Sequence, residues 1–422
     1  MVNPINAANR DTLTRRSFVT VGALGTMTLA ACSADNAAES SASDASAGSA
    51  ASASSSSAPV FSGNIKVLPA LDEVEINPIE TVTVSTDDST LTKVTVATED
   101  GEELPGELSA DGKTWTSTEH MIFDRSYTVA WEADDSDGVS GTGKSTFATV
   151  SAPYEANALV NFIEGATYGV GYIIQLIFSE PVVNKADVEK RISIKGGGDQ
   201  EGKFRWYSDT MLRYRPKDKW APNSTITVDI DLFGFDIGNG MIGNHTTSHS
   251  FKTWEKRYAF VDNNTKKMKM YVNDKVIREA PVTLGNSEWP SPVGQLVIKE
   301  HEKSYFFNPG SLALTPGDPH YYEPFWASNT SRLTNGGVFV HQALPAAWSS
   351  VGIANVSHGC IGLLPADAEF FHNNFGIGDV VETVNTGYPE ADPDDGYGDW
   401  NIPFEHYSDS SWTGNWWSLV LG

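Results

Sequence analysis

The sequence predicts a mainly β protein, in which two small β-sandwiches precede a mostly-β domain with one or two short helices. Three observations support this class. Short runs that alternate apolar and polar residues recur from residue 63 to residue 253, with turn residues between them. No helical period stands out in that region. The 422 residues are 40% hydrophobic and 11% aromatic, which suffices for two or three separate cores.

Residues 1–32 are expected to be a signal peptide and are left out of the fold. Arg15 and Arg16 precede an apolar stretch, residues 18–31, that is too short to span a bilayer. The stretch ends in Leu-Ala-Ala-Cys32, which resembles a bacterial lipobox, so Cys32 is the expected lipidation site. The paired arginines also resemble a twin-arginine signal. An ordinary secretory signal with an incidental cysteine is the alternative.

Residues 33–62 are expected to form a tether, because the segment is almost all Ser and Ala as far as residue 58 and has no apolar face to bury. One lipid anchor and this tether would hold the folded part on the outer face of the cell membrane, in the cell-wall zone. The chain has 54 acidic and 29 basic residues, a net charge of −25. Such acidity argues against nucleic acid as a partner, since binding a phosphate backbone needs Lys and Arg.

Residues 63–150 and 151–253 are predicted to be the two sandwiches. Their strands are expected at 81–85, 93–97, 127–131, 173–178, 204–207, 211–214 and 226–230. His245 and His249 form an HxxxH pair in the second sandwich. The sequence around them looks like loop and strand, and no third ligand accompanies them, so we expect no metal there.

Residues 254–386 are predicted to form the third, mostly-β domain. Its strands are expected at 258–261, 267–272, 275–277, 337–341 and 379–384. Residues 365–375 indicate a short helix, with a proline and acidic residues in the first turn and a glycine after the end. The Trp-rich tail, residues 387–422, is expected to pack on this domain, since its indole rings are too costly to leave in water.

One string in this domain carries chemistry: Ser357-His358-Gly359-Cys360, with His341 nineteen residues before the cysteine. A thiol is only a few per cent ionised near pH 7, and an imidazole within reach can take its proton. His341, at a strand end, and His358, two residues from the thiol, are both candidates. The amides of Gly359 and Cys360 can face a developing oxyanion. A buried core cysteine is the plain alternative.

This string resembles the signature of YkuD-type L,D-transpeptidases, a His followed about fifteen or more residues later by Ser/Thr-His-Gly-Cys. Residues 336–341, 348–352, 378–386 and 398–403 also resemble the multi-domain lipoprotein members of the family from high-GC Gram-positive bacteria. Those members carry two immunoglobulin-like modules before the catalytic domain. The resemblance therefore implies that both predicted sandwiches are immunoglobulin-like, and it covers most of the mature chain.

The resemblance also implies a role for each residue of the string. Cys360 would be the nucleophile, and His341 would be the general base, held by a nearby backbone carbonyl. His358 would shape the site and share in proton handling. Gly359 and Cys360 would supply the oxyanion amides, and Ser357 would brace the loop through its hydroxyl.

A lid over the cleft is implied for residues 315–330, with Tyr321 or Tyr322 offering a hydroxyl to the substrate. Trp348 and Gly362 complete the substrate-binding residues that the resemblance implies. Gly362 is a departure, because the family usually has Asn or Arg at that position. A side-chain hydrogen bond is lost there, which puts the positioning of the loop or the substrate in question.

The activity implied is 3→3 cross-linking of peptidoglycan stem peptides through a thioester on Cys360, with tetrapeptide stems as donor and acceptor and no cofactor or metal. Carbapenem β-lactams are the implied covalent inhibitors. Water or a protein amine as acceptor would instead give an L,D-carboxypeptidase or a protein-anchoring enzyme. An inactive wall-binding lipoprotein is a further alternative. A papain-like protease lacks support, because its cysteine precedes its histidine.

Overall fold

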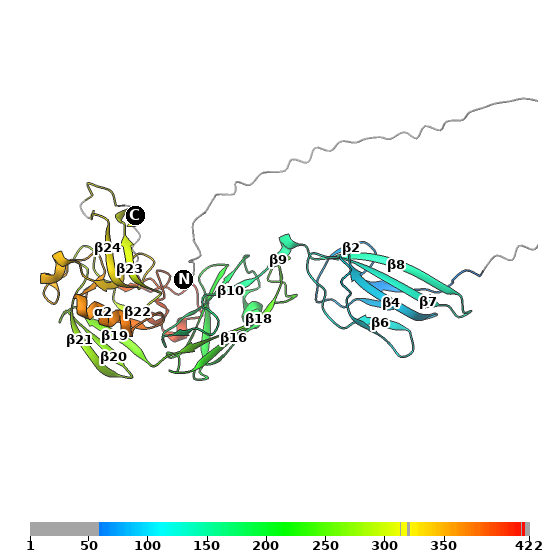
Figure 1. Cartoon of the computed structure of the whole chain (residues 1–422), viewed down its shortest axis with the longest axis horizontal. Helices are drawn as coiled ribbons and strands as arrows, with labels where there is room; N and C mark the ends of the chain where they lie inside the picture. The colour runs from blue at the N-terminus through cyan, green and yellow to red at the C-terminus, as the bar shows by residue number, and fades with distance from the viewer. Residues whose placement is uncertain (1–58, 313, 319–320, 415, 418–422) are drawn as a thin grey trace, which may run out of the picture. The chain divides into compact units, whose positions relative to one another are not determined.

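The computed structural model describes residues 59–312, 314–318, 321–414 and 416–417, and most of its elements are strands (Figure 1). The mainly β class predicted from the sequence is confirmed. The predicted signal peptide, Cys32 and the tether as far as residue 58 lie outside the described residues. Within the described part of the chain, no helix is long and apolar enough to cross a membrane.

The first sandwich, called module 1 below, consists of two four-stranded sheets with the orders β1-β3-β6-β5 and β2-β8-β7-β4. Its strands are β1 (Lys66–Leu68), β2 (Glu73–Ile76), β3 (Thr83–Ser85), β4 (Thr90–Thr98), β5 (Gly106–Leu108), β6 (Thr114–Ser117), β7 (Ser126–Asp134) and β8 (Ser140–Thr149). Alternate residues point inward, so that Val84 and Tyr127 meet in one core. The three strands predicted in this region are present, as β3, β4 and β7.

The second sandwich, module 2, has the sheet orders β10-β12-β15-β14 and β11-β18-β16-β13, with a separate β9–β17 pair. Its elements are β9 (Glu155–Ala156), β10 (Ala158–Val160), β11 (Thr167–Tyr168), β12 (Ile174–Phe178), α1 (Lys185–Glu189), β13 (Ile192–Gly196), β14 (Gly202–Trp206), β15 (Met211–Pro216), β16 (Thr225–Asp231), β17 (Ile242–Gly243) and β18 (Thr246–Thr253). Leu176, Leu212 and Phe251 lie in its core. As the sequence indicated, β14 and β15 pair across a short turn.

The HxxxH pair of module 2 lies at the start of strand β18. His249 is within the strand, opposite Val228, and the ring nitrogen Nδ1 of His245 lies 2.6 Å from the side-chain oxygen of Asn244. Among the residues that the structure describes, no three His, Cys, Asp or Glu side chains are grouped to hold a metal ion.

The third domain, residues 254–386, has one nine-stranded mixed sheet, ordered β22-β27-β19-β20-β21-β26-β25-β24-β23. Its strands are β19 (Arg257–Asp262), β20 (Lys267–Val272), β21 (Lys275–Thr283), β22 (Gly294–Val297), β23 (Glu300–Phe307), β24 (Phe325–Arg332), β25 (Phe339–Gln342), β26 (Ile361–Leu363) and β27 (Val380–Val384). Strands β25 and β26 are parallel neighbours, with His341 opposite Gly362. This pairing brings the predicted base and nucleophile to one place in the sheet.

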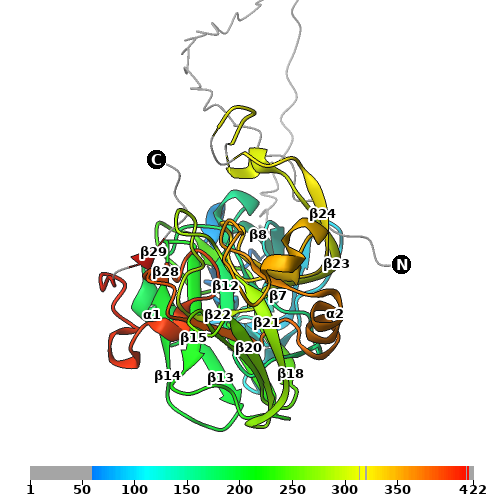
Figure 2. The same ribbon diagram turned by 90° about the vertical axis from the view of Figure 1, so that its left-hand side faces the viewer.

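Helix α2 (Pro365–Asn374) packs against β24, β25 and β26 (Figure 2), and it is the short helix predicted from the sequence. Strands β23 and β24 form a hairpin that stands out from the rest of this domain in Figure 1. The predicted lid, residues 315–330, is therefore not a loop throughout. From Phe325 onward it belongs to β24, because the ladder with β23 runs as far as Phe307.

The described part of the tail, residues 387–414 and 416–417, contacts the catalytic domain and also module 2. On the catalytic side, the Asn401 side chain donates a hydrogen bond to a β22 carbonyl. On the other side, Arg205 and Arg215 of β14 and β15 donate to backbone carbonyls of the tail at 2.6 and 2.5 Å. The sequence did not predict the contact with module 2. The arginines bind backbone carbonyls that lie far away in the chain, so the sequence around each arginine carries no motif that would predict the contact.

Candidate active site

His341 lies in strand β25, between β24 and β26, and is 7% exposed. Its Nδ1 atom lies 2.8 Å from the carbonyl oxygen of Gln342. A carbonyl can only accept, so Nδ1 carries the proton and Nε2 is left as an acceptor. Burial lowers the pKa of His341, which keeps the ring neutral. The imidazole is therefore neutral and held with Nε2 free of a proton, which is the tautomer that a general base requires.

Cys360 immediately precedes strand β26 and is 8% exposed. Its thiol donates to the carbonyl oxygen of Gly337, with an Sγ···O distance of 3.5 Å. Burial raises the pKa of Cys360 to about 12, and the backbone amide of Phe339 opposes that shift in part. The resting thiol is therefore protonated at neutral pH.

The two pKa shifts have one physical cause. Burial penalises the charged form of each group, so the pKa of Cys360 rises and that of His341 falls. A neutral thiol and a neutral imidazole result.

The loop that carries the cysteine is braced by two serine hydroxyls. Ser357 Oγ donates to the carbonyl of Cys360 at 2.6 Å, which is the bracing contact that the resemblance implied. Ser291 Oγ donates to the carbonyl of Gly359 at 2.7 Å. Gly359 has a φ of +108°, a left-handed conformation that favours glycine. Ser291 was not predicted, because it belongs to no motif and acts on a backbone carbonyl.

A cavity of about 240 Å³ lies over this loop. Cys360, His341, His358, Ser357 and Gly362 all line it, so the structure brings these five predicted residues together. The described lining residues are Thr283, Phe307, Tyr322, Phe325, Gly336, Gly337, His341, Ala343, Leu344, Ala347, Val356, Ser357, His358, Cys360 and Gly362, and none of them is Asp, Glu, Lys or Arg.

Of the two lid tyrosines that were predicted, Tyr322 lines the cavity, and Tyr321 is not among the described lining residues. The Tyr322 ring lies 5.4 Å from the ring of His358 and 5.7 Å from that of Phe325, measured between centroids. Burial is the main cause that raises the pKa of Tyr322 to about 12, and the nearby Cys360 contributes a smaller part. Its hydroxyl therefore stays protonated and can donate a hydrogen bond to a substrate.

Trp348 lies beside the cavity. It belongs to a 3₁₀ helix, Pro345–Ser350, and its indole nitrogen donates to the carbonyl of Ala343 at 2.9 Å. Its side chain is 41% exposed, and it is not among the described lining residues, although Leu344 and Ala347 of the same segment are. This hydrogen bond holds the 3₁₀ helix against the end of strand β25. Among the described residues that line the cavity with Cys360, Trp348 does not appear.

Packing accounts for Gly362, the departure from the family. A Cβ at this position would lie 2.8 Å from the methyl carbon of Thr283 and 3.3 Å from Cβ of Ala343. The hydroxyl of Thr283 donates to the carbonyl of Ala354 at 2.8 Å and accepts from the amide of Val356. Thr283 thus fills the space of the missing side chain and holds the segment that leads to Ser357. The sequence did not indicate this role.

Comparisons with known proteins agree with this architecture. Residues 256–383 match YkuD, the L,D-transpeptidase catalytic domain, and residues 73–236 match a bacterial Ig domain, so the chain carries an L,D-transpeptidase catalytic domain behind a bacterial Ig domain. The chain is 31% identical over 328 residues to L,D-transpeptidase 2 of Mycobacterium tuberculosis (strain CDC 1551 / Oshkosh), covering 77% of this chain and 79% of that protein. The chain belongs to the L,D-transpeptidase family.

Other relatives share less sequence. L,D-transpeptidase 5 of Mycobacterium tuberculosis (strain ATCC 25618 / H37Rv) is 25% identical over 345 residues, covering 80% of this chain and 74% of that protein. A solved structure of LD transpeptidase LdtMt1 in complex with imipenem is 26% identical, covers 54% of this chain and 97% of its own, and has a TM-score of 0.48.

Proposed function

We propose that the chain is a peptidoglycan L,D-transpeptidase that forms 3→3 cross-links, with Cys360 as nucleophile and His341 as general base. One observation carries the proposal. The parallel pairing of β25 and β26 places both residues on one cavity, with the Nδ1 proton of His341 fixed by Gln342 and its Nε2 able to accept. Membership of the L,D-transpeptidase family supports the same reaction class.

The reaction runs in two acyl-transfer steps. In the first, Sγ of Cys360 attacks the carbonyl carbon of the third stem residue while Nε2 of His341 takes the thiol proton. The amide bond to the terminal D-Ala breaks, D-Ala leaves with that proton, and a thioester remains. In the second, the side-chain amine of a diamino acid on another stem attacks the thioester and gives a proton to Nε2 of His341. The imidazolium passes this proton to the departing sulfur, which restores the Cys360 thiol. The amides of Gly359 and Cys360 would stabilise the oxyanion in both steps.

The acceptor decides between two enzymes that share this acyl-enzyme. Water would release a tripeptide stem, as in an L,D-carboxypeptidase, and a protein amine would anchor a protein to the wall. An inactive wall-binding lipoprotein is the alternative from another class. Gly362 was the sequence feature that favoured this inactive alternative. Gly362 favours it less in the structure, because Thr283 occupies the space of the missing side chain.

The location proposed for the enzyme follows from the sequence. Cys32 would carry a lipid, and the tether would let the modules and catalytic domain work in the wall above the membrane. Carbapenem β-lactams are the inhibitor class proposed, since an acyl-accepting thiol opens their ring. Lipid on Cys32 can be tested by comparing membrane fractions of cells that produce the full chain or its Cys32→Ala variant.

The test of function is incubation of the purified chain with a disaccharide tetrapeptide, followed by mass spectrometry. The expected product is a dimer that has lost one D-Ala and whose fragmentation places the cross-link between two third residues. Cys360→Ala and His341→Gln should abolish it. A tripeptide monomer alone would instead establish the carboxypeptidase. No product from a folded wild type would contradict the acyl-transfer proposal.

A further inference from the structure

The chain around the thiol includes a short turn between β24 and β25, residues 333–338, which we call the thiol loop. Its Gly337 carbonyl accepts the hydrogen bond from the Cys360 thiol. Phe339, the next residue after the loop, offers the amide that favours the thiolate. The position of the loop therefore decides how the Gly337 carbonyl meets the sulfur, whereas Phe339 is held in strand β25 by its pairing with Arg332.

The tail forms hydrogen bonds with the thiol loop. Residues 392–396, which we call the tail turn, present a carboxylate to it, and the amide of Gly336 donates to Oδ1 of Asp395 at 2.5 Å. The side-chain amide of Asn335 donates to the carbonyl of Asp394 at 2.9 Å. Gly396 approaches so closely that a Cβ there would lie 2.5 Å from a loop carbonyl oxygen. The loop and the tail turn thus form one packed unit.

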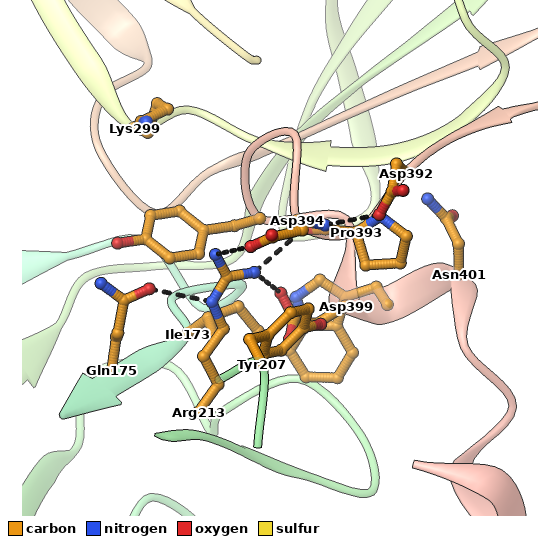
Figure 3. Close-up of polar contacts among 12 residues, drawn as sticks. Ile173, Gln175, Tyr207, Arg213, Lys299, Asp392, Pro393, Asp394, Asp399 and Asn401 are labelled. Carbon is orange, nitrogen blue, oxygen red and sulfur yellow. Dashed lines mark hydrogen bonds and ion pairs between the residues drawn. The ribbon is translucent and has the colours of Figure 1, made fainter. Parts of the chain in front are cut away.

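Module 2 in turn holds the tail turn through Arg213 of strand β15 (Figure 3). The guanidinium donates to the carbonyl of Pro393 at 2.8 Å and to the carboxylate of Asp399 at 3.1 Å, and it lies 3.6 Å from the carboxylate of Asp394. Gln175, also of module 2, accepts from its Nε atom at 2.9 Å. The Arg213 side chain is 4% exposed and that of Asp399 is fully buried.

We propose that Asp395 is a positioning residue for the Cys360 thiol, and that module 2 takes part in the active site by fixing the tail turn through Arg213. This inference rests on the proposed function in one respect, the role of Cys360 as nucleophile. It makes module 2 more than a spacer. An immunoglobulin-like module then supports the loop whose carbonyl holds the nucleophile in place.

The loop also has partners outside the tail turn, so it should stay folded without Asp395, whose carboxylate Lys299 also faces. Arg332 of β24 donates to the carbonyls of Thr334 and Asn335 at 3.0 and 3.1 Å, and Lys299 contacts the Asn335 side chain. Arg332 is also the charged group that lowers the pKa of Cys360 from a distance. The other titratable side chains that line the cavity with Cys360 are those of His341, His358 and Tyr322. Replacing Asp395 therefore changes the placement of the loop and leaves these groups in position.

The test uses the full chain and measures two rates, alkylation of Cys360 by iodoacetamide across pH and acylation by a carbapenem. In Asp395→Ala the Gly336 amide loses its carboxylate acceptor, so the hydrogen bond from the Cys360 thiol to the Gly337 carbonyl should weaken. The alkylation profile should move to lower pH, whereas acylation should slow by on the order of 10-fold to 100-fold, because the sulfur is misplaced. Asp395→Asn keeps the Oδ1 acceptor and should stay within about threefold of wild type.

The matched control is Asp409→Asn, which changes an exposed tail carboxylate that caps Ser411. Thermal unfolding of each variant separates a moved thiol from a partly unfolded chain. A wild-type profile and rate in Asp395→Ala would overturn the proposal, and so would an Asn variant as impaired as Ala. Alkylation needs only the thiol. A shifted profile with no acylation in wild type would therefore uphold the positioning role and reject the proposed function.

The contribution of module 2 is tested with Arg213→Lys, which keeps the charge but loses the planar fork. In that fork Nη1 reaches Pro393 and Asp399, while Nε donates to Gln175. It should shift alkylation and acylation in the same directions as Asp395→Ala, to a smaller extent. Arg191→Lys is the control, since Arg191 forms an exposed pair with Asp231 in the same module. Equal behaviour of the two lysine variants would overturn the link to module 2.

Discussion

The junction between modules 1 and 2 and the junction between module 2 and the catalytic domain use different chemistry. The first is a small apolar cluster around Phe123, Val150, Ile242 and Phe233. The second places three guanidinium groups of β14 and β15, those of Arg205, Arg213 and Arg215, against carbonyls and a buried carboxylate of the tail.

The difference shows which junction fixes the relative position of its two parts. A buried charge is tolerated only when partners surround it, so the arginines of module 2 require the tail to stay where it is. Tyr207 reinforces the constraint, since its hydroxyl donates to Asp399 at 2.8 Å. The first junction carries no comparable requirement. Module 2 is therefore fixed to the tail by buried polar contacts, whereas its junction with module 1 depends mainly on apolar packing.

The largest expected effect comes from cutting the chain at each junction. A chain that begins at residue 151 should unfold at nearly the same temperature as one that begins at residue 59, because only a small apolar patch is uncovered. A chain that begins at residue 254 leaves the buried Asp399 without Arg213 and should be strongly destabilised. Circular dichroism melts of the three chains make the comparison. Equal melts for the last two would contradict the account of the second junction.

Breaking one ion pair should come next in size. Arg213→Met leaves the carboxylate of Asp399 buried without its charge partner and should cost about 3–5 kcal/mol of unfolding free energy. Arg191→Met removes an exposed pair with Asp231 and should cost at most about 1 kcal/mol. Denaturant unfolding of both variants checks the prediction. Similar losses from the two would mean that the buried pair is no more important than a surface one.

Asp379, beside Gly169 of module 2, should give a pH dependence to the second junction. Burial raises the pKa of this carboxyl to about 7. Between about pH 4 and 7 the unfolded chain loses this proton while the folded chain keeps it, so stability falls as pH rises. The effect should be on the order of 2–3 kcal/mol between pH 5 and 8. Melts of wild type and Asp379→Asn at both pH values measure it, and parallel profiles would refute it.

The smallest effect is expected at the first junction. The side-chain amide of Asn77 donates to the carbonyl of Gly234 at 2.7 Å, linking module 1 to module 2. Asn77→Ala should cost about 1 kcal/mol or less, since the bond is partly solvated. Carbapenem acylation of Cys360 should not change. A slowed acylation in this variant would show that module 1 also acts on the site.

The sequence predicted many of the strands and singled out the candidate string Ser357 to Cys360, because both leave local patterns. Period-two alternation marked β4, β7 and β16, and the chemistry of Ser357 to Cys360 lies within four consecutive residues. Helix α2 was predicted from its first-turn proline and its terminal glycine. Each of these features depends on neighbours in the chain.

The support of the site could not be predicted in the same way. Ser291, Thr283 and Asp395 all act on backbone groups of distant segments, and a backbone carbonyl or amide is the same whatever the sequence. The neutral resting pair was also missed, since it results from burial of both Cys360 and His341. Three-dimensional packing decides these features, and no motif records it.

The most direct test of the central claim is an intact mass of the chain from residue 59 after incubation with meropenem, beside its Cys360→Ala variant. The account predicts a one-to-one adduct on wild type and none on the variant, because the Cys360 thiol and an oriented His341 imidazole line one cavity. A folded wild type that gains no mass would contradict the claim. Cys360 would then be a buried core cysteine, and the chain a wall-binding protein.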